Sequence, residues 1–160
     1  METNKYFGIF YLKMGLLLFW TLWFTLAFFS NLFDLLQTYH IFTSISFHSG
    51  NWKALASVIS IYHMSPLVLS ILFYCDLFAE VIILFLLVKS IFYFYRHNNN
   101  YWKYVNLAFI FSIGLWCVFI IMEEIFIAYA FEATHIRLCI FEILSLFVFH
   151  LLSSESVSIT

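Results

Sequence analysis

Charged, chain-breaking and sulfur-bearing residues are all scarce in this chain. Only 10% of the 160 residues are Asp, Glu, Lys or Arg, too few to cover a water-soluble domain. Four glycines and one proline leave no Gly-rich loop that could cradle a phosphate. The three cysteines form no Cys-x-x-Cys motif or disulfide framework. The seven Lys and Arg residues form no basic patch, so nucleic acid is not an expected partner.

Apolar residues take the place of those that are missing. Hydrophobic residues make up 64% of the chain, 22 of them Phe, and the mean hydropathy is +0.98. Four apolar runs are long enough to cross a bilayer, at about residues 14–36, 66–88, 104–129 and 134–152. The sequence therefore predicts an all-α, polytopic membrane protein, a four-helix transmembrane bundle forming one domain over residues 1–160 with the lipid bilayer as its surroundings.

The outer loop over residues 37–65 is long enough to hold structure of its own. Its apolar residues recur at helical spacing, as Trp52, Leu55, Ala56, Ile59 and Tyr62. This pattern predicts a short interfacial helix on the outer membrane surface. Such a helix could serve as a lid over the mouth of the bundle or could be a plain surface helix.

Basic residues predict the orientation of the spans. Those flanking one side of the predicted bundle are Lys5, Lys13, Lys89, Arg96 and Lys103. Only Lys53 and Arg137 flank the other side. Because Lys and Arg concentrate on the cytoplasmic side, we expect a multi-pass protein with both termini in the cytoplasm.

Acidic residues within the apolar runs are the first candidates for function, because an ionisable group in hydrocarbon is costly. The candidate ligand-binding residues are Asp76, Glu80, Glu124, Glu142 and Asp34. Asp76 and Glu80 lie four residues apart and share a helix face. At the helical rise, Glu124, Glu142 and Asp76 would lie about 9, 12 and 15 Å from the outer ends of their spans, with Glu80 at about 21 Å.

Glu124, Glu142 and Asp76 are therefore expected to converge in the outer half of the bundle. Three carboxyl groups in a dry site cannot all be ionised, so at least one would be protonated or a cation would bind among them. The alternative is that protonated acids simply form hydrogen bonds between helices.

The predicted hairpin between the last two spans is the segment richest in chemistry. Thr134 could cap the last helix, and Glu132 with His135 forms a Glu-x-x-His pair. Di-iron bundles need that pair twice, and the sequence has it once. A single divalent metal remains an alternative, and no other cofactor is expected. The candidate ligands for this metal are Glu132, His135, Glu124 and Glu142.

Arg137 offers a structural explanation for the same segment. Its guanidinium could pair with Glu132 or Glu123 and lock the hairpin.

Several segments resemble those of small bacterial four-span integral membrane proteins of unknown activity. They are Phe19–Trp23, Asn31–Asp34, Ser49–Asn51, Glu123–Phe126, Ala128–Tyr129 and Glu132–Leu138. The resemblance covers most of the chain. It implies a four-span fold in a bacterial inner membrane and no particular activity.

The first half of the chain is also similar to the sterol-isomerase and emopamil-binding (EXPERA-like) group. The similar features are Asp34 after an aromatic first helix, an outer loop ending at Pro66, and Phe73–Asp76 followed by Glu80. This resemblance implies acidic residues held against a cationic amphiphile or a carbocation, and it assigns no catalytic role.

Three classes of function follow. The first is a non-catalytic membrane protein, a binder or accessory subunit of a membrane complex, whose acidic and His cluster binds a cation or a lipid-like amine. The second is a membrane enzyme that acts on a lipid-like substrate by carboxylate acid–base chemistry. The third is a component of a proton or ion pathway.

Overall fold

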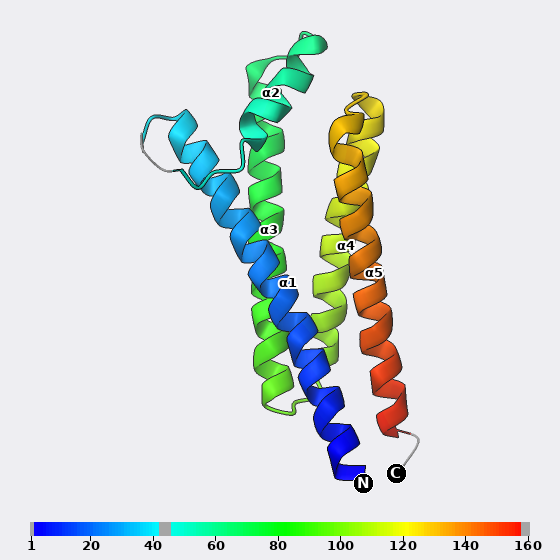
Figure 1. Cartoon of the computed structure of the whole chain (residues 1–160). Coiled ribbons are helices and arrows are strands. Elements are labelled where there is room, and N and C mark those ends of the chain that lie inside the picture. The colour runs from blue at the N-terminus through cyan, green and yellow to red at the C-terminus, as the bar shows by residue number, and fades with distance from the viewer. Residues whose placement is uncertain (1, 42–45, 158–160) are drawn as a thin grey trace.

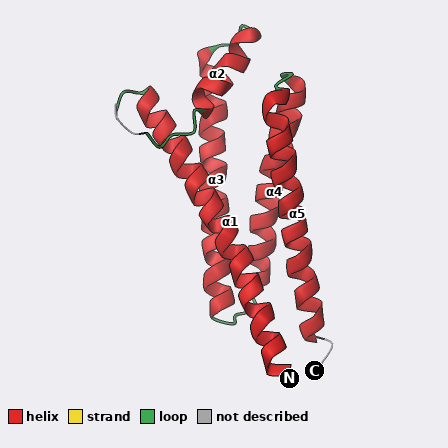
Figure 2. Ribbon diagram, in the orientation of Figure 1, coloured by secondary structure: helices red, strands yellow, loops and turns green. Residues whose placement is uncertain are grey.

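The protein is built from helices. The computed structural model describes residues 2–41 and 46–157, with side chains over residues 8–41 and 46–152. This part of the chain forms five helices and no strand (Figures 1 and 2). They are α1 (Glu2–Thr38), α2 (Asn51–Ile61), α3 (Pro66–Tyr95), α4 (Tyr101–Ile125) and α5 (Tyr129–Val157). The predicted all-α fold is confirmed.

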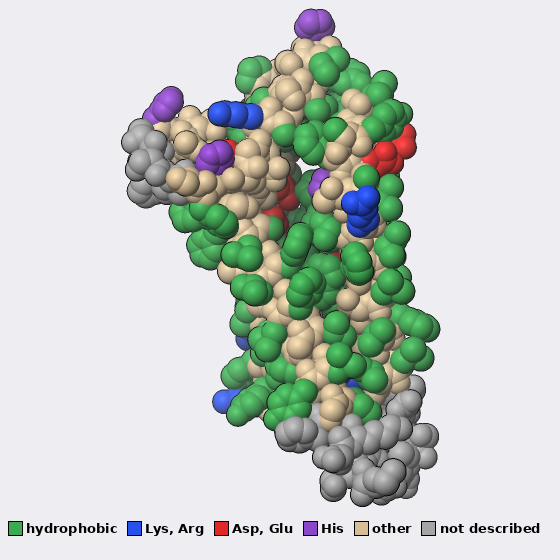
Figure 3. Space-filling model, in the orientation of Figure 1, with side chains coloured by type: hydrophobic (Ala, Val, Ile, Leu, Met, Phe, Trp, Pro, Cys, Tyr) green, Lys and Arg blue, Asp and Glu red, His purple; other side chains and the backbone are tan. Residues whose placement is uncertain are grey.

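Four of the helices are long and apolar enough to cross a membrane. The candidate spans are Gly8–Thr38, Pro66–Tyr95, Tyr101–Ile125 and Tyr129–Leu152. Large apolar side chains also cover their outer faces, where Leu22, Phe78 and Phe141 are each at least 60% exposed. In the space-filling view, hydrophobic side chains cover most of the visible surface (Figure 3). The chain is a multi-pass membrane protein, since water would not tolerate such a surface.

The two ends of the bundle differ. Both chain termini and the α3–α4 turn lie at one end, called here the terminal end (Figure 1). The opposite end, called the α2 end, carries α2 and the α4–α5 turn. Along its length α1 crosses in front of α3 and leans away from α5 toward the α2 end. The bundle is therefore closed at the terminal end and splayed at the α2 end.

Close packing fills the terminal half. Leu17, Trp20, Phe109 and Phe149 are almost completely buried there. The Trp20 indole donates a hydrogen bond of 3.0 Å to the Ser145 hydroxyl, which joins α1 to α5. Together these contacts make the terminal half a conventional apolar core with a polar clasp between helices.

Helix α2 forms as predicted and lies against α1 and α3. Its Ile59 side chain is buried, and Trp52 and Leu55 pack on the small core of Leu35, Phe73 and Leu77. Gly50 begins the helix with φ of 75°, a left-handed conformation that glycine adopts without strain.

Other left-handed residues follow the ends of α1 to α4. They are His40, His63, His97 and Ile127, with φ between 51° and 57°. Histidine is one of the residue types that tolerate this conformation, whereas for a β-branched residue such as Ile127 it is strained.

The ends of the helices differ from the predicted spans. Helix α5 begins at Tyr129 instead of residue 134, so Thr134 lies inside the helix and the prediction that it caps the helix is wrong. Helix α3 runs on to Tyr95, beyond the predicted end at residue 88. The predictions followed the apolar runs, but α1, α3 and α5 extend beyond these runs, and α4 ends at Ile125, short of the predicted residue 129.

Candidate functional site

A cavity of about 900 Å³ opens in the half of the bundle nearer the α2 end. All five helices contribute to its walls. Figure 3 shows its mouth on the side of the bundle, between the α1–α3 part and the α4–α5 part, with acidic and histidine atoms visible inside. Most lining residues are apolar, and its strongly polar side chains are Asn31, Asn51, Asp76, Glu80, Glu123 and His135.

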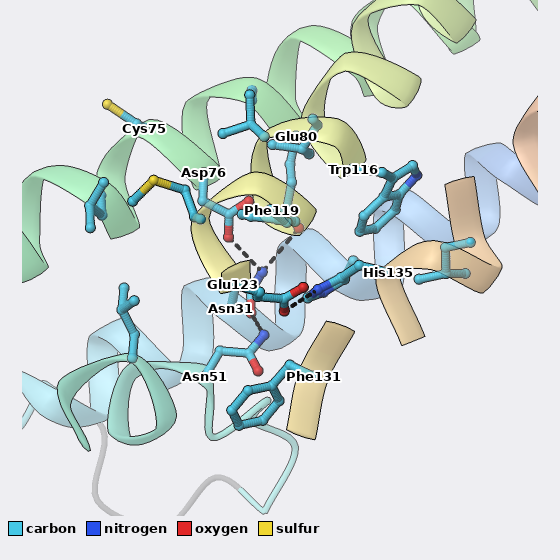
Figure 4. A pocket seen from close by; sticks show the side chains of 18 of the residues that line it. Asn31, Asn51, Cys75, Asp76, Glu80, Trp116, Phe119, Glu123, Phe131 and His135 are labelled. Atoms are coloured by element: carbon cyan, nitrogen blue, oxygen red, sulfur yellow. Dashed lines mark hydrogen bonds and ion pairs between the residues drawn. The ribbon is translucent and has the colours of Figure 1, made fainter. Parts of the chain in front are cut away.

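Asn31 of α1 organises one wall of this cavity. Its Nδ2 donates hydrogen bonds to Glu80 Oε1 at 3.0 Å and to Asp76 Oδ2 at 3.3 Å. Its Oδ1 accepts a hydrogen bond of 2.9 Å from Asn51 Nδ2 at the start of α2. One amide thereby connects three helices and gathers the two acids of α3 (Figure 4).

Glu123 of α4 and His135 of α5 form a second polar group in the cavity wall. Glu123 is 8% exposed, and its Oε1 lies 2.6 Å from His135 Nδ1, which makes a short hydrogen-bonding contact. The imidazole also stacks against Trp116, at 5.6 Å between ring centroids, and makes a tilted contact with Phe119 at 5.0 Å. The aromatic rings fix its orientation beside the cavity (Figure 4).

Three acidic oxygens at the cavity are left without a partner. Asp76 Oδ1, Glu80 Oε2 and Glu123 Oε2 are buried and accept no hydrogen bond from any residue that the structure describes. Buried polar atoms are usually satisfied, and an unsatisfied carboxyl oxygen is costly. The cavity therefore has spare capacity for a ligand that donates hydrogen bonds.

Asp34 lies apart from these acids. Its Oδ2 accepts hydrogen bonds from the backbone N–H of Trp52 at 2.7 Å and from the Ser49 hydroxyl at 3.1 Å. His48 Nδ1 lies 3.8 Å from its other oxygen. A carboxylate in this position accepts a hydrogen bond from a free backbone N–H at the start of α2, and it interacts favourably with the positive end of the helix dipole. Asp34 holds α2 in place and lines a separate, smaller hollow of about 560 Å³.

The structure does not bring together Asp76, Glu124 and Glu142, which the sequence predicted to converge. Glu124 is exposed, and its neighbour Glu123 faces the interior instead. Consecutive residues of a helix point about 100° apart, so only one of the two can face inward. The buried stripe of α4 is Val105, Phe109, Ser112, Trp116 and Glu123.

Glu142 is buried but does not line the cavity. It is 1% exposed, and its polar neighbours are the Trp116 indole and the Ser112 hydroxyl. Glu142 Oε2 and Trp116 Nε1 make no hydrogen bond within the described structure. Glu142 is therefore not part of the acidic group that lines the cavity.

The predicted metal ligands also lie apart. His135 contacts Glu123, Glu132 lies beside Glu124, and Glu142 lies deeper in the bundle. Among the side chains that the structure describes, over residues 8–41 and 46–152, no group of three or more His, Cys, Asp or Glu is placed to hold a metal ion.

The predicted ion pair of Arg137 is not formed. Among the described salt bridges, none joins Arg137 to Glu132 or Glu123, and the partner of Glu123 is His135. Because α5 begins at Tyr129, His135 and Arg137 point to nearly opposite sides of one continuous helix. Arg137 is exposed.

Asn31, Asn51 and Glu123 were not among the predicted ligand-binding residues. Asn31 carried a usable signal, since it precedes Asp34 in an aromatic helix and an amide in a membrane span needs a polar partner. Glu123 continues the apolar stripe of α4 at helical spacing. Asn51 carried no such signal, because its contact depends on the path of the outer loop.

No protein-family model, curated protein or solved structure matches this chain. Its function must be argued from the chemistry of the cavity.

Proposed function

We propose that the protein binds a cationic amphiphile, a molecule with a positively charged head and a hydrocarbon body, in the cavity between its helices. The observation that carries this proposal is the corner formed by Asp76 and Glu80, where two carboxyl groups gathered by Asn31 each keep one buried oxygen unpartnered. A cation placed there would offset the cost of burying acidic groups away from water.

The rest of the cavity suits the body of such a ligand. Its other walls include Leu55, Val58, Leu72, Phe111 and Leu115. A volume of about 900 Å³ lies within the usual range for small-molecule sites, which bury most of the surface of their ligand in apolar walls. An acyl or isoprenoid chain would find apolar contact over most of the cavity wall, away from the acidic corner and from the pair formed by Glu123 and His135.

Entry from the bilayer is supported by the position of the mouth, on the side of the bundle between membrane-spanning helices (Figure 3). A ligand dissolved in lipid could enter without crossing water, which favours a membrane-soluble amine over a small hydrated cation.

Binding of dodecylamine and dodecanol to the protein in nanodiscs tests the proposal. Both compounds have the same chain, but only the amine is charged at pH 7. The fluorescence of Trp23 and Trp116, which line the cavity, provides the signal, with empty nanodiscs to subtract partitioning. We expect saturable amine binding at least tenfold tighter than that of the alcohol, since a hydrogen-bonded charge contributes about 1.5–3 kcal/mol. Equal affinities would contradict the proposal.

A membrane enzyme is the second candidate, and the contact between Glu123 and His135 supports it. A carboxyl group 2.6 Å from an imidazole beside an apolar cavity is a plausible pair for general acid–base chemistry on a lipid-like substrate. Incubation with a total lipid extract in D₂O, followed by mass spectrometry, would detect deuterated or rearranged products. Activity that His135→Phe abolishes and Glu124→Gln retains would favour the enzyme.

A proton or ion pathway has less support. Below the cavity, Leu17, Phe109 and Phe149 fill much of the terminal half with apolar side chains, and the buried polar side chains there include Lys13 and Ser90. A conducted ion would need a continuous path of polar groups or water through this half.

We also infer that the terminal end faces the cytoplasm of a bacterial inner membrane. Both termini lie at the same end of the bundle (Figure 1). Lys89, Arg96 and Lys103 flank the α3–α4 turn at that end, in keeping with the cytoplasmic preference of basic residues. Lys5, the first basic residue used in the prediction, lies outside the described side chains. Labelling of single cysteines introduced at Asn99 and Ser57 with a membrane-impermeant reagent tests this orientation.

A further inference from the structure

The acidic corner has more hydrogen-bond acceptors than donors. Asn31 has two amide N–H groups, and it uses both of them on Asp76 Oδ2 and Glu80 Oε1. One N–H of the Asn51 amide donates to Asn31 Oδ1. Asp76 Oδ1 and Glu80 Oε2 then remain, both buried and without a donor from the residues that the structure describes. Ionised carboxyl oxygens only accept hydrogen bonds, so a partner that binds both acids in their ionised form would be a hydrogen-bond donor.

We propose that the head of the ligand is a primary or secondary amine, whose N–H groups donate to Asp76 Oδ1 and Glu80 Oε2, and that the site discriminates against quaternary ammonium heads. This inference rests on the proposed function and specifies the chemistry of its ligand.

The discrimination follows from the chemistry of the two kinds of head. A primary ammonium group has three N–H donors, enough for both unpartnered oxygens and one further acceptor. A quaternary ammonium group has the same charge but no N–H, and its methyl groups keep the nitrogen farther from the carboxyl oxygens. It would leave Asp76 Oδ1 and Glu80 Oε2 without hydrogen bonds. A missing hydrogen bond costs more free energy at a buried polar group than at one that water can reach.

Glu80 is the better placed of the two acids to set this preference. It is 4% exposed, lies on the cavity wall and is held through its other oxygen by Asn31 at 3.0 Å. Its unpartnered oxygen is thus fixed in position before a ligand arrives, which lowers the entropic cost of recognition.

Aromatic side chains could in principle reverse the preference, because quaternary ammonium groups bind well to aromatic faces. Two of the aromatic side chains that line this cavity are already engaged with His135. Trp116 stacks with Phe24 at 5.8 Å and with His135 at 5.6 Å, and Phe119 packs on the same imidazole at 5.0 Å. These two rings therefore orient His135, and the unpartnered oxygens of Asp76 and Glu80 remain the groups that distinguish the two kinds of head.

A matched ligand series tests the inference. Dodecylamine and dodecyltrimethylammonium both carry one positive charge and the same chain, and dodecanol serves as the uncharged reference. Binding is measured on the full chain in nanodiscs by tryptophan fluorescence, at pH 7 and below the critical micelle concentrations. We expect dodecylamine to bind at least tenfold more tightly than the quaternary compound, the size expected for one lost hydrogen bond to a charged group.

The outcomes separate this inference from the proposed function. If both cations bind equally and more tightly than dodecanol, the preference for N–H donors is wrong while cationic binding stands. If neither cation binds more tightly than dodecanol, the proposed function fails and the inference fails with it.

Two variants locate the preference in the molecule. The double substitution Asp76→Asn with Glu80→Gln keeps the shapes of both side chains and replaces two acceptor oxygens by amide donors. We expect it to reduce the ratio of amine to quaternary affinity to within about twofold of unity, because its amides no longer require a donor. The matched control is Glu124→Gln, an exposed acid away from the cavity, which should keep the wild-type ratio. A double variant that also keeps the wild-type ratio would overturn the assignment, and the ligand series on the wild-type chain decides the preference even if the variant does not fold.

Discussion

Asn31 donates a hydrogen bond of 3.0 Å to Glu80 across the interface between α1 and α3, and both side chains are only 4% exposed. A single amide of α1 thus determines how an acid of α3 is presented to the cavity. Through Asn51 the same amide is also connected to α2. The position of the surface helix and the geometry of the acidic corner are therefore coupled.

Replacing Asn31 by leucine should destabilise the protein. Asn31→Leu preserves the approximate volume but removes the donor to Asp76 and Glu80, and each buried acceptor left without a donor costs about 1–3 kcal/mol. We expect a decrease in melting temperature of about 4–10 °C, measured by tryptophan fluorescence in detergent. Adding Glu80→Leu to this variant should recover part of the loss. An additive second loss would contradict the interaction between the two residues.

Glu123 and Glu124 should behave differently although they are adjacent. Glu123→Ala removes the partner of His135 and should lower the free energy of unfolding by about 1–3 kcal/mol, the cost of leaving a buried polar group without its hydrogen bond. Glu124→Ala changes an exposed side chain and should stay within about 0.5 kcal/mol of wild type. Chemical unfolding of the two variants side by side checks this, and the opposite order would show that α4 faces the cavity in a different rotation.

Loss of Asp34 should loosen α2. Asp34→Ala removes the acceptor for the Trp52 amide and the Ser49 hydroxyl, and loss of such a cap costs about 0.5–2 kcal/mol. Hydrogen–deuterium exchange should therefore accelerate in the amides of Asn51–Ile61 and stay unchanged in α4. Lys53→Ala, an exposed change on the same helix, is the control and should leave the exchange of α2 as in wild type.

Glycine at position 127 should stabilise the protein. Ile127 has φ of 53° and is 66% exposed, so the substitution relieves backbone strain and loses little packing. Relief of the backbone strain at a left-handed, β-branched residue is expected to raise the free energy of unfolding by about 1 kcal/mol. Thermal unfolding of Ile127→Gly should show a higher melting temperature, whereas Ile121→Gly, an exposed position inside α4, should lower it. A decrease in both variants would refute the left-handed turn.

A disulfide formed under oxidation should report the packing of α4 against α5. The thiols of Cys117 and Cys139 lie against each other, and all three cysteines are free. Mild oxidation with copper–phenanthroline should join these two within one chain, as seen by mass spectrometry of the digested protein. The bond should persist in Cys75→Ser and disappear in Cys117→Ser. A bond from Cys139 to Cys75 instead would mean that the helices pack in another order.

The fold could be predicted from composition and periodicity alone. A segment that crosses hydrocarbon must hydrogen-bond its own backbone N–H and C=O groups, and a long apolar helix does so. The shared face of Asp76 and Glu80 followed from their spacing of four residues. The surface helix followed from the apolar positions of α2, and Ile59 is indeed its buried residue.

The site was harder to predict because two adjacent acids compete for one helix face. Nothing in the neighbourhood of Glu123 and Glu124 fixes which one points inward. Only the longer stripe through Phe109, Ser112 and Trp116 does so. A prediction based on that stripe would have selected Glu123.

The contacts of the outer loop lay beyond any periodic pattern. Asp34 accepts a hydrogen bond from the start of α2, and Asn51 donates one to Asn31. Both depend on how a non-helical segment returns toward the bundle, which side-chain spacing does not encode.

Because the mouth of the cavity opens on the side of the bundle, it affects how the occupancy of the site depends on ligand concentration. A ligand that enters between membrane-spanning helices equilibrates with the bilayer, so occupancy follows its mole fraction in lipid and not its concentration in water. A hydrophobic amine with a large partition coefficient would fill a site of modest intrinsic affinity at trace aqueous levels. Enlarging the lipid phase at constant total amine would empty the same site, with no change in any contact that the protein makes.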